Sequence, residues 1–189
     1  MEAHGQSLWF PRDARKGQTS RTRGPIQSRV EPMVLLVRDR KRESMSDKSA
    51  SKGTLVTGVI GEDVHIVGIR ILEYALGEAG FKVVPLGSQV SQKEFVEAAI
   101  EVNADAILVS SLSGHAETLV PGLREKCIEA GLSDVILYLG GYLLVGEMQW
   151  EVVEKKFMGM GLNRIYQPGT SPTQVIADLE ADIASRRRR

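Results

Sequence analysis

The sequence predicts an α/β protein whose folded part is built on a doubly wound, five-stranded parallel sheet. Three observations predict this class. Short apolar runs alternate with amphipathic helical patterns from Gly53 onwards, the links between them are short, and the run after Asp105 is continuously apolar to Val109. A parallel strand that is covered on both faces has this composition. Alternating units with short links favour right-handed crossovers, and we expect the flavodoxin-like, or Rossmann-like, strand order 2-1-3-4-5.

The apolar runs and the helical periods give the expected elements in order. The strands are Leu55–Ile60, Lys82–Leu86, Asp105–Val109, Val135–Leu139 and Arg164–Tyr166. The helices are Val67–Ala79, Ser91 to about Val102, about Thr118–Ala130, roughly Glu147–Met160, and Thr170/Ser171 to about Ala184.

Local signals justify several of these boundaries. Ser91 and Glu94 have the spacing of a capping box, in which each side chain bonds the other residue's backbone N–H. Ser171 precedes Pro172, and proline is favoured in the first turn of a helix. Glycines such as Gly80 and Gly131 follow the last periodic residue, as helix-ending glycines do.

Charge divides the chain into three parts, although its formal net charge is +0. Residues 1–52 hold 12 Lys and Arg against 6 Asp and Glu and show no sustained period. This composition predicts a disordered basic extension. Residues 53–184 form the expected domain, which is acidic, and residues 185–189 the expected basic tail. The segment from Met45 to Lys48 has the form of an ordinary protein start, so we expect translation to begin at Met45. Peptides from before Met45 in a mass spectrum of the native protein would refute this.

Composition excludes several classes of function. The acidic body argues against nucleic-acid binding by the folded part, and we interpret the basic ends as solvated tails. No apolar run approaches the ~20 residues of a membrane span. The single cysteine, Cys127, excludes an intramolecular disulfide and a cysteine metal cluster, and fits a reducing cytoplasm.

Asp63 and His65 lie two residues apart on a loop directly after the first expected strand. Ligands bind at the carboxyl edge of doubly wound sheets. A histidine that binds a metal through one ring nitrogen usually donates its other N–H to a carboxylate, and this spacing can supply both partners. On spacing alone, the simpler alternative is that Asp63 caps the next helix and His65 is an ordinary loop residue.

Two further motifs follow the third and fourth expected strands. They are Ser110-Ser111-Leu112 and Gly140-Gly141. In the predicted strand order the loops after strands one, three and four lie together, which favours one shared site. Taken singly, the serines also fit a strand end and the glycines a plain turn.

The three motifs together resemble the Asp-x-His-x-x-Gly, Ser-x-Leu, Gly-Gly signature of cobalamin-binding domains. Over roughly Gly53 to Ile183 the chain further resembles the small, or sigma, subunits of glutamate mutase (methylaspartate mutase). The segments that carry this likeness are Gly58–Gly61, Val109–Leu112, Gly122–Cys127, Gly140-Gly141 with Val145-Gly146, and Pro168–Pro172.

The resemblance implies how the cofactor is held. His65 is the implied lower axial ligand of cobalt, in place of the cofactor's own dimethylbenzimidazole, and Asp63 accepts its second N–H. Ser110 and Ser111 are implied to bond the displaced nucleotide tail, and Gly68 to let that tail pass beside the first helix.

Gly140 and Gly141 are implied to let the backbone approach a flat ring, because they have no Cβ. The rest of the implied cofactor-binding set is formed by loop neighbours, namely Glu62, Val64, Ile66, Leu112, Tyr142, Leu143, Leu144, Val145 and Gly146. His65 is the implied metal ligand, and none of these residues is implied to be catalytic.

The chain departs from the family pattern in two loops. Ser113 and Ala116 stand where the family usually has an aromatic residue and a glycine, and Tyr142–Leu144 is bulkier and less polar than usual. His115 is interpreted as a surface loop residue.

The resemblance also implies an activity. The cofactor is adenosylcobalamin, whose cobalt–carbon bond breaks homolytically, and the reaction is the reversible rearrangement of L-glutamate to threo-3-methylaspartate. The implied partner is a large TIM-barrel subunit that binds glutamate, in an assembly of two small and two large subunits.

Two alternatives stay open: a stand-alone cobalamin carrier or sensor, and a small subunit of another adenosylcobalamin-dependent mutase. A response-regulator receiver is disfavoured because Ser110-Ser111 occupies the place of its phosphoacceptor aspartate. A flavodoxin is disfavoured because Glu62 and Asp63 would repel a phosphate after strand one.

Overall fold

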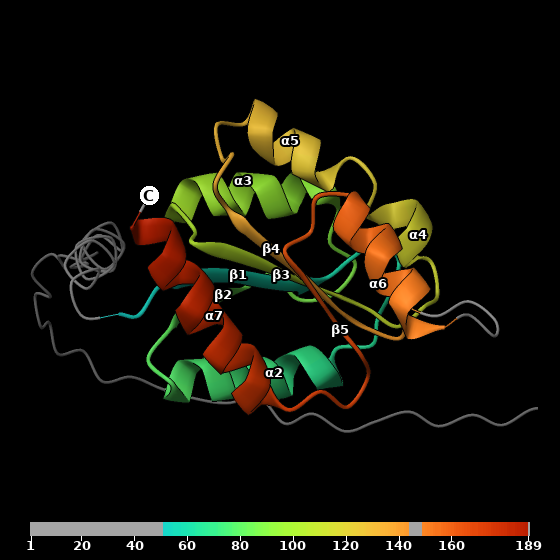
Figure 1. The fold of residues 1–189 in the computed structure, drawn as a ribbon, viewed down its shortest axis with the longest axis horizontal. Helices are drawn as coiled ribbons and strands as arrows, with labels where there is room; N and C mark the ends of the chain where they lie inside the picture. Colours follow the sequence, from blue (N-terminus) through green and yellow to red (C-terminus); the bar gives the residue numbers. More distant parts are fainter. Residues whose placement is uncertain (1–50, 144–148, 189) are drawn as a thin grey trace, which may run out of the picture. The chain divides into compact units, whose positions relative to one another are not determined.

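The computed structural model describes residues 51–143 and 149–188, in which five parallel strands form one sheet of order β2-β1-β3-β4-β5 (Figure 1). The predicted fold class and strand order are confirmed. The strands are β1 Thr54–Val59, β2 Lys82–Pro85, β3 Ala106–Ser111, β4 Ile136–Gly141 and β5 Arg164–Tyr166. The helices are α2 Val67–Glu78, α3 Gln92–Val102, α4 Ala116–Leu119, α5 Leu123–Glu129, α6 Trp150–Gly159 and α7 Pro172–Arg187.

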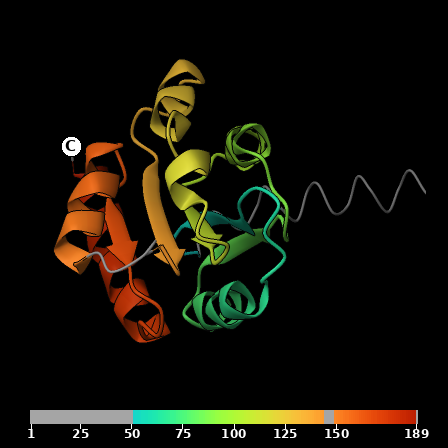
Figure 2. The same ribbon diagram turned by 90° about the vertical axis from the view of Figure 1, so that its right-hand side faces the viewer.

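Helices cover both faces of the sheet. Helices α2 and α7 lie on one face and α3 to α6 on the other (Figures 1 and 2). Side chains alternate along each strand, so each face has its own apolar core. In β3, for example, Leu108 packs in the cluster under α2 and α7, whereas Ile107 and Val109 pack in the larger cluster under the other helices.

The strand register brings three strand ends to one level. Val59 of β1 pairs with Ser110 of β3, and Ser110 pairs with Gly140 of β4. The loops that follow these strands therefore start side by side at the carboxyl edge.

The predicted caps are present. The Ser91 hydroxyl accepts from the Glu94 backbone N–H, and the Glu94 carboxylate accepts from the Ser91 backbone N–H at 2.8 Å. The Ser171 hydroxyl accepts from the Gln174 backbone N–H, with Pro172 in the first turn of α7.

The single helix expected over about Thr118–Ala130 is wrong. The structure has two short helices, α4 and α5, separated at Pro121-Gly122. Proline has no N–H to continue a helix, and Gly122 has φ +86°, which turns the chain. The Gln92 side chain donates to the carbonyls of Leu119 and Pro121 at this break.

The last helix is longer than the sequence predicts. Helix α7 continues to Arg187, three residues beyond its expected end at Ala184. Arg186 donates to the Asp105 carboxylate at 2.5 Å and to the Asp105 carbonyl at 3.0 Å. Positive side chains also suit the negative end of the helix dipole. These contacts fold the first of the four terminal arginines onto the domain, and a count of charges could not reveal them.

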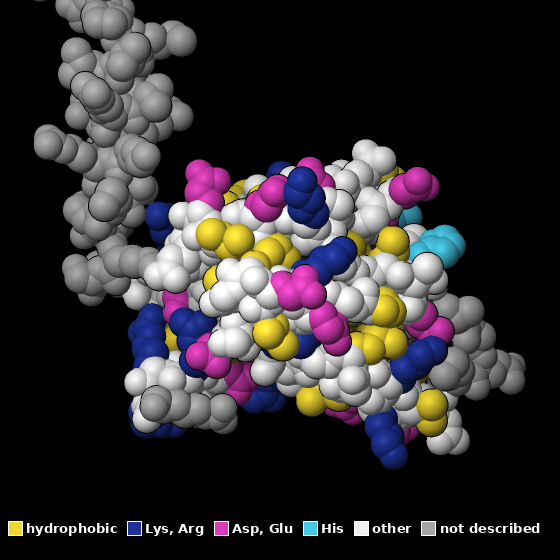
Figure 3. Space-filling view, turned by 90° about the horizontal axis from the view of Figure 1, so that it is seen from above, with side chains coloured by type: hydrophobic (Ala, Val, Ile, Leu, Met, Phe, Trp, Pro, Cys, Tyr) yellow, Lys and Arg dark blue, Asp and Glu magenta, His cyan; other side chains and the backbone are white. Residues whose placement is uncertain are grey.

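Residues 1–50 lie outside the described part of the chain, and with them the expected extension and the expected start at Met45. Within the described part, no helix is both long enough and apolar enough to cross a membrane. Cys127 is buried, and burial raises the pKa of its thiol, so it acts as a packing residue. On the α3–α6 side, acidic, basic and apolar side chains are interspersed (Figure 3).

Candidate functional site

The loops after β1 and β3 are joined at the carboxyl edge by one buried carboxylate. Asp63 is 3% exposed. Its Oδ2 accepts from the backbone N–H groups of Leu112, at 2.5 Å, and Ser113, at 3.0 Å. Its Oδ1 accepts from the His65 backbone N–H at 2.9 Å and lies 2.7 Å from His65 Nδ1. The structure thus brings the Asp63–His65 loop and the Ser110–Leu112 loop together.

The bonds to Asp63 determine its ionisation. Burial alone raises the pKa of a carboxyl group, but the hydrogen bonds from His65, Leu112 and Ser113 outweigh burial and hold the pKa of Asp63 below its usual value. Asp63 is therefore ionised at neutral pH and can only accept hydrogen bonds. Nδ1 of His65 must then carry the proton in this contact.

His65 consequently presents the lone pair of Nε2 away from Asp63. The side chain of His65 is 62% exposed, while that of Asp63 has no exposed surface. An imidazole that is held by a carboxylate through Nδ1 and turns Nε2 outward has the arrangement of a metal-binding histidine. Where the structure is described, no three His, Cys, Asp or Glu side chains are grouped to hold a metal ion.

Replacing Asp63 by asparagine is expected to lower the free energy of unfolding by about 1–3 kcal/mol at pH 7, because asparagine has one acceptor oxygen and carries an NH2 donor in place of the second. The folded pKa of Asp63 is lowered, so its stabilising contribution is present above the unfolded pKa of about 4 and is lost as pH falls through the folded pKa. The free energies of unfolding of the parent and of Asp63→Asn, measured with urea, should therefore converge as the pH is lowered below about 4. Glu62→Gln, on an exposed neighbour, is the control; an equal effect of both changes at pH 7 would contradict this role.

A cavity of about 520 Å³ lies beside this loop, between α2, α7 and the carboxyl half of the sheet. Helix α2 contributes Gly68, Ile71 and Leu72 to the lining, and the sheet contributes Leu108 and Ser110. Most of the lining is apolar. The other described lining residues are Ile69, Val109, Leu112, Tyr138, Gly140, Gly141, Tyr142, Tyr166, Gln167, Pro168, Gly169, Thr170, Pro172 and Val175. Such concave, mostly apolar sites with few polar groups are typical of cofactor sites.

Two of the glycines leave room in this cavity. A Cβ added to Gly68 would meet nothing within 4 Å, so packing within the described chain does not require glycine there. A Cβ at Gly140 would meet the Tyr166 Cβ at 3.6 Å, an ordinary contact. Glycine inside a helix costs up to about 1 kcal/mol relative to alanine. Packing among the described residues therefore gives no reason for a glycine at position 68.

Gly141 serves a different purpose. Its φ is +119°, and an added Cβ would lie 2.1 Å from the Ser111 carbonyl oxygen. The backbone pairing of β3 and β4 at Ser111 and Gly141 therefore needs a residue without a side chain.

The two serines point in opposite directions. Ser110 lines the cavity and is 7% exposed. Ser111 is fully buried and absent from the cavity lining, and its Oγ has no hydrogen-bond partner among the described residues. Alternation along β3 places them on opposite faces of the sheet.

The remaining predicted residues are spread around the site. Leu112 and Tyr142 line the cavity and are 40% and 54% exposed. Glu62 and Val64 are exposed, and Ile66 is the half-buried N-cap of α2. Leu143 is 1% exposed and packs in the core on the α3–α6 side, away from the cavity. Leu144, Val145 and Gly146 lie outside the described residues.

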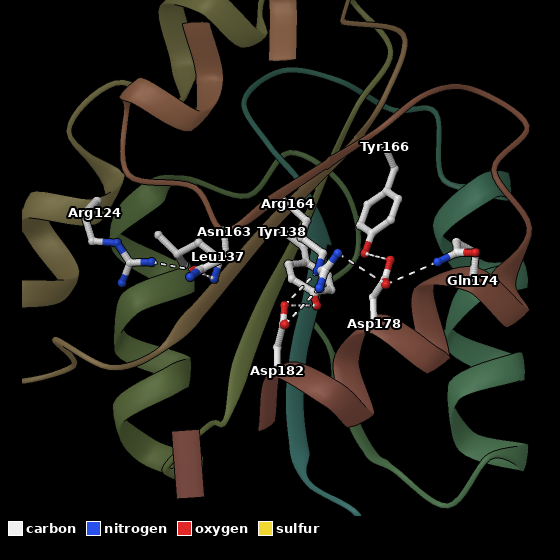
Figure 4. A network of polar contacts seen from close by, with 9 residues as sticks. All are labelled: Arg124, Leu137, Tyr138, Asn163, Arg164, Tyr166, Gln174, Asp178 and Asp182. Carbon is white, nitrogen blue, oxygen red and sulfur yellow. Dashed lines mark hydrogen bonds and ion pairs between the residues drawn. The ribbon is translucent and has the colours of Figure 1, made fainter. Parts of the chain in front are cut away.

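The sequence reasoning missed two aromatic lining residues, Tyr138 and Tyr166. Tyr138 is two positions before Gly140 on β4, and this period-2 spacing could have placed it on the same face. Tyr166 pairs with Gly140 across β4 and β5. Figure 4 shows both tyrosines and the polar contacts around them.

Comparison with known proteins agrees with this geometry. The family model described as "B12 binding domain" matches residues 53–173. Fold and site together therefore define a cobalamin-binding domain.

The similar proteins narrow this class. A glutamate mutase sigma subunit of Carboxydothermus hydrogenoformans is 57% identical over 129 residues, covering 68% of this chain and 94% of the relative. The sigma subunit of Clostridium cochlearium is 52% identical, and the match covers 70% of this chain and 96% of the relative. The sigma subunit of Escherichia coli O157:H7 is 46% identical, and the match covers 71% of this chain and 91% of the relative. The chain belongs to the family of glutamate mutase sigma subunits.

Solved structures agree on the fold. A cobalamin-binding protein of Desulfitobacterium hafniense DCB-2 superposes with TM-score 0.55 at 23% identity, covering 68% of this chain and 58% of that chain. The monomethylamine corrinoid protein of Methanosarcina barkeri superposes with TM-score 0.57 at 22% identity, covering 79% of this chain and 66% of that chain. This chain spans less than two thirds of either of these two chains.

Proposed function

We propose that this chain is the small subunit of a glutamate mutase, and that it binds the lower face of adenosylcobalamin with His65 as the axial ligand of cobalt. The observation that carries the proposal is the Asp63–His65 pair with its outward Nε2, set beside a mostly apolar cavity. The high identity to sigma subunits of glutamate mutase supports the choice of reaction.

The residues present fit this cofactor. His65 supplies one nitrogen ligand in a fixed tautomer, and Asp63 makes that nitrogen a stronger donor. The cavity can take up the nucleotide tail, and Ser110 places a hydroxyl group in its lining. Gly68 and Gly140 leave the space that the tail needs.

The bound cofactor supplies the radical chemistry that interconverts L-glutamate and threo-3-methylaspartate. The contribution of this chain is to bind and orient. Asp63 keeps the proton on Nδ1 of His65, and the buried bonds from Leu112 and Ser113 hold that carboxylate in place. The cavity wall excludes water from the tail.

We further propose that a larger TIM-barrel subunit binds glutamate and covers the other face of the cofactor, in an assembly of two small and two large subunits. The mouth of the site supports a partner there, because exposed apolar side chains surround it. Among the described residues these are Val64, Leu112 and Tyr142. Neighbouring exposed apolar side chains are typical of a surface that another molecule covers.

Reconstitution tests this function. The chain is combined with the large subunit of a glutamate mutase, adenosylcobalamin and L-glutamate, and proton NMR follows the methyl signal of methylaspartate. Product that requires both subunits and the coenzyme is expected. A chain that retains coenzyme after desalting with the large subunit, yet yields no methylaspartate, would instead support a carrier or another mutase.

A further inference from the structure

Helix α2 carries apolar side chains on two opposite faces. On one face, Ile69 and Leu76 are buried. The other face presents Val67, Ile71 and Tyr74, which are 70%, 59% and 73% exposed and which we call the outer stripe. At 3.6 residues per turn these three lie in one row, and Leu76 lies on the opposite side of the helix from Val67. Burial of apolar area therefore does not by itself determine which face of α2 contacts the sheet.

A buried polar contact distinguishes the two faces. Glu73 lies on the inner face of α2 and is 9% exposed, and Thr57 of β1 is fully buried. The Thr57 hydroxyl donates to Glu73 Oε1 at 2.7 Å. Arg70, about one turn earlier in the helix, donates to Glu73 Oε2 at 2.9 Å. Both oxygens of this carboxylate therefore have a partner.

These contacts require one orientation of α2. If the helix turned about its axis to place the outer stripe against the sheet, Glu73 would move away from β1, and the buried Thr57 hydroxyl would lose its acceptor. A buried donor without an acceptor is costly, whereas one apolar face can replace another. The best-attested role of a buried polar group between packed helices is to specify one register at some expense of stability.

The orientation of α2 also determines where the residues before it lie. The helix begins at Val67, two residues after His65, and the backbone N–H of Arg70 donates to the Ile66 carbonyl. The backbone of His65 therefore leads directly into the first turn. A turn of α2 about its axis would carry Ile66 with it and pull His65 away from Asp63.

We propose that Thr57, Glu73 and Arg70 fix the rotation of α2 about its axis. Glu73 is thereby a positioning residue, which acts on His65 through the helix. This positioning role rests on the proposed function only for what His65 binds, because the surroundings of the imidazole can be measured in the chain alone.

The test replaces the polar pair by apolar residues of similar shape, Thr57→Val together with Glu73→Leu, in the full chain. This double variant leaves neither buried partner unpaired, so its free energy of unfolding in urea should equal or exceed that of the parent. Proton–nitrogen NMR spectra of protein labelled with nitrogen-15 histidine follow the His65 ring, whose signal is assigned from its loss in His65→Gly. The parent should give one His65 signal, and the double variant a second one with about a tenth or more of the intensity.

Glu73→Gln is the conservative variant. Its amide oxygen still accepts from Thr57, so it should keep a single His65 signal. Arg70→Met removes the other contact of Glu73 at a side chain that is 53% exposed, so this variant should fold. A second, weaker His65 signal is expected from it, which keeps the proposal testable if the double variant does not fold.

The control is Glu97→Leu, which breaks the exposed Lys93–Glu97 pair of α3. It should leave the single His65 signal unchanged. Aquocobalamin titration, followed by absorption, then connects the positioning role to the proposed function. If only molecules with the parent orientation of α2 bind, the dissociation constant of the double variant should rise by the inverse of the parent-like fraction of the His65 signal, about twofold for two equal signals.

A single His65 signal at the parent position in the double variant would overturn the proposal, and a lower free energy of unfolding beside it would assign these residues to fold stability alone. An unchanged signal in Arg70→Met has the same consequence if the double variant does not fold, and so has a second signal of equal size in Glu97→Leu. If the His65 signal divides as expected but the parent binds no aquocobalamin, the positioning role stands and the proposed function fails. The two failures are therefore distinguishable.

Discussion

Gly68→Leu is expected to weaken cobalamin binding about 10- to 100-fold, because the new side chain enters the space that we propose for the nucleotide tail, and overfilling a close-packed contact costs about 1–3 kcal/mol. The protein itself should not be destabilised, since nothing lies within 4 Å of a Cβ at this position. Removing a helical glycine should, if anything, add up to about 1 kcal/mol to the free energy of unfolding. Absorption titration with aquocobalamin and urea unfolding measure the two effects.

Gly77 provides a matched control in the same helix. It too has nothing within 4 Å of an added Cβ, and it does not line the cavity. Gly77→Leu should therefore leave the dissociation constant unchanged. If Gly68→Leu binds cobalamin as tightly as Gly77→Leu does, the tail does not pass α2 at Gly68.

Gly141→Ala is expected to destabilise the fold by about 2 kcal/mol or more, whether or not cobalamin is present, because the position combines a positive φ with a backbone clash. An added Cβ would lie 2.1 Å from the Ser111 carbonyl oxygen, and backbone atoms in a sheet cannot move aside cheaply. The ends of β3 and β4 would have to separate. Urea unfolding without ligand measures the loss.

Its neighbour gives the comparison. Gly140→Ala places a Cβ at an ordinary distance from Tyr166, so the free energy of unfolding should change little. Equal stability of the two variants would show that the strand pairing at Gly141 is not the constraint described here.

This pair also shows what the sequence could and could not predict. The motif Gly140-Gly141 was recognisable, and both glycines were assigned the same purpose, a close approach to a flat ring. The structure separates them, because only Gly141 has a positive φ and a backbone oxygen against its missing side chain. Backbone torsion depends on register with the neighbouring strand, which no local pattern contains.

The sheet itself was predictable, because its strand order follows from short right-handed connections and continuous apolar runs. Pro121 and Gly122 are residue types that break helices, but the helical period around them favours one continuous helix. The long-range polar contacts were not predictable. These contacts join residues from different elements. They are the hydrogen bonds of Asp63 with Leu112 and Ser113, the contacts of Arg164 with α7, and the buried Thr57–Glu73 hydrogen bond of 2.7 Å.

The central claim is that the imidazole of His65 coordinates cobalt. Electron paramagnetic resonance of reduced cobalamin bound to the full chain tests it most directly, with protein labelled with nitrogen-15 histidine. If His65 binds cobalt, the label should change the nitrogen splitting, His65→Gly should remove the histidine splitting, and His115→Gly, on an exposed loop, should retain it. A spectrum that is the same for the parent and His65→Gly would contradict the account.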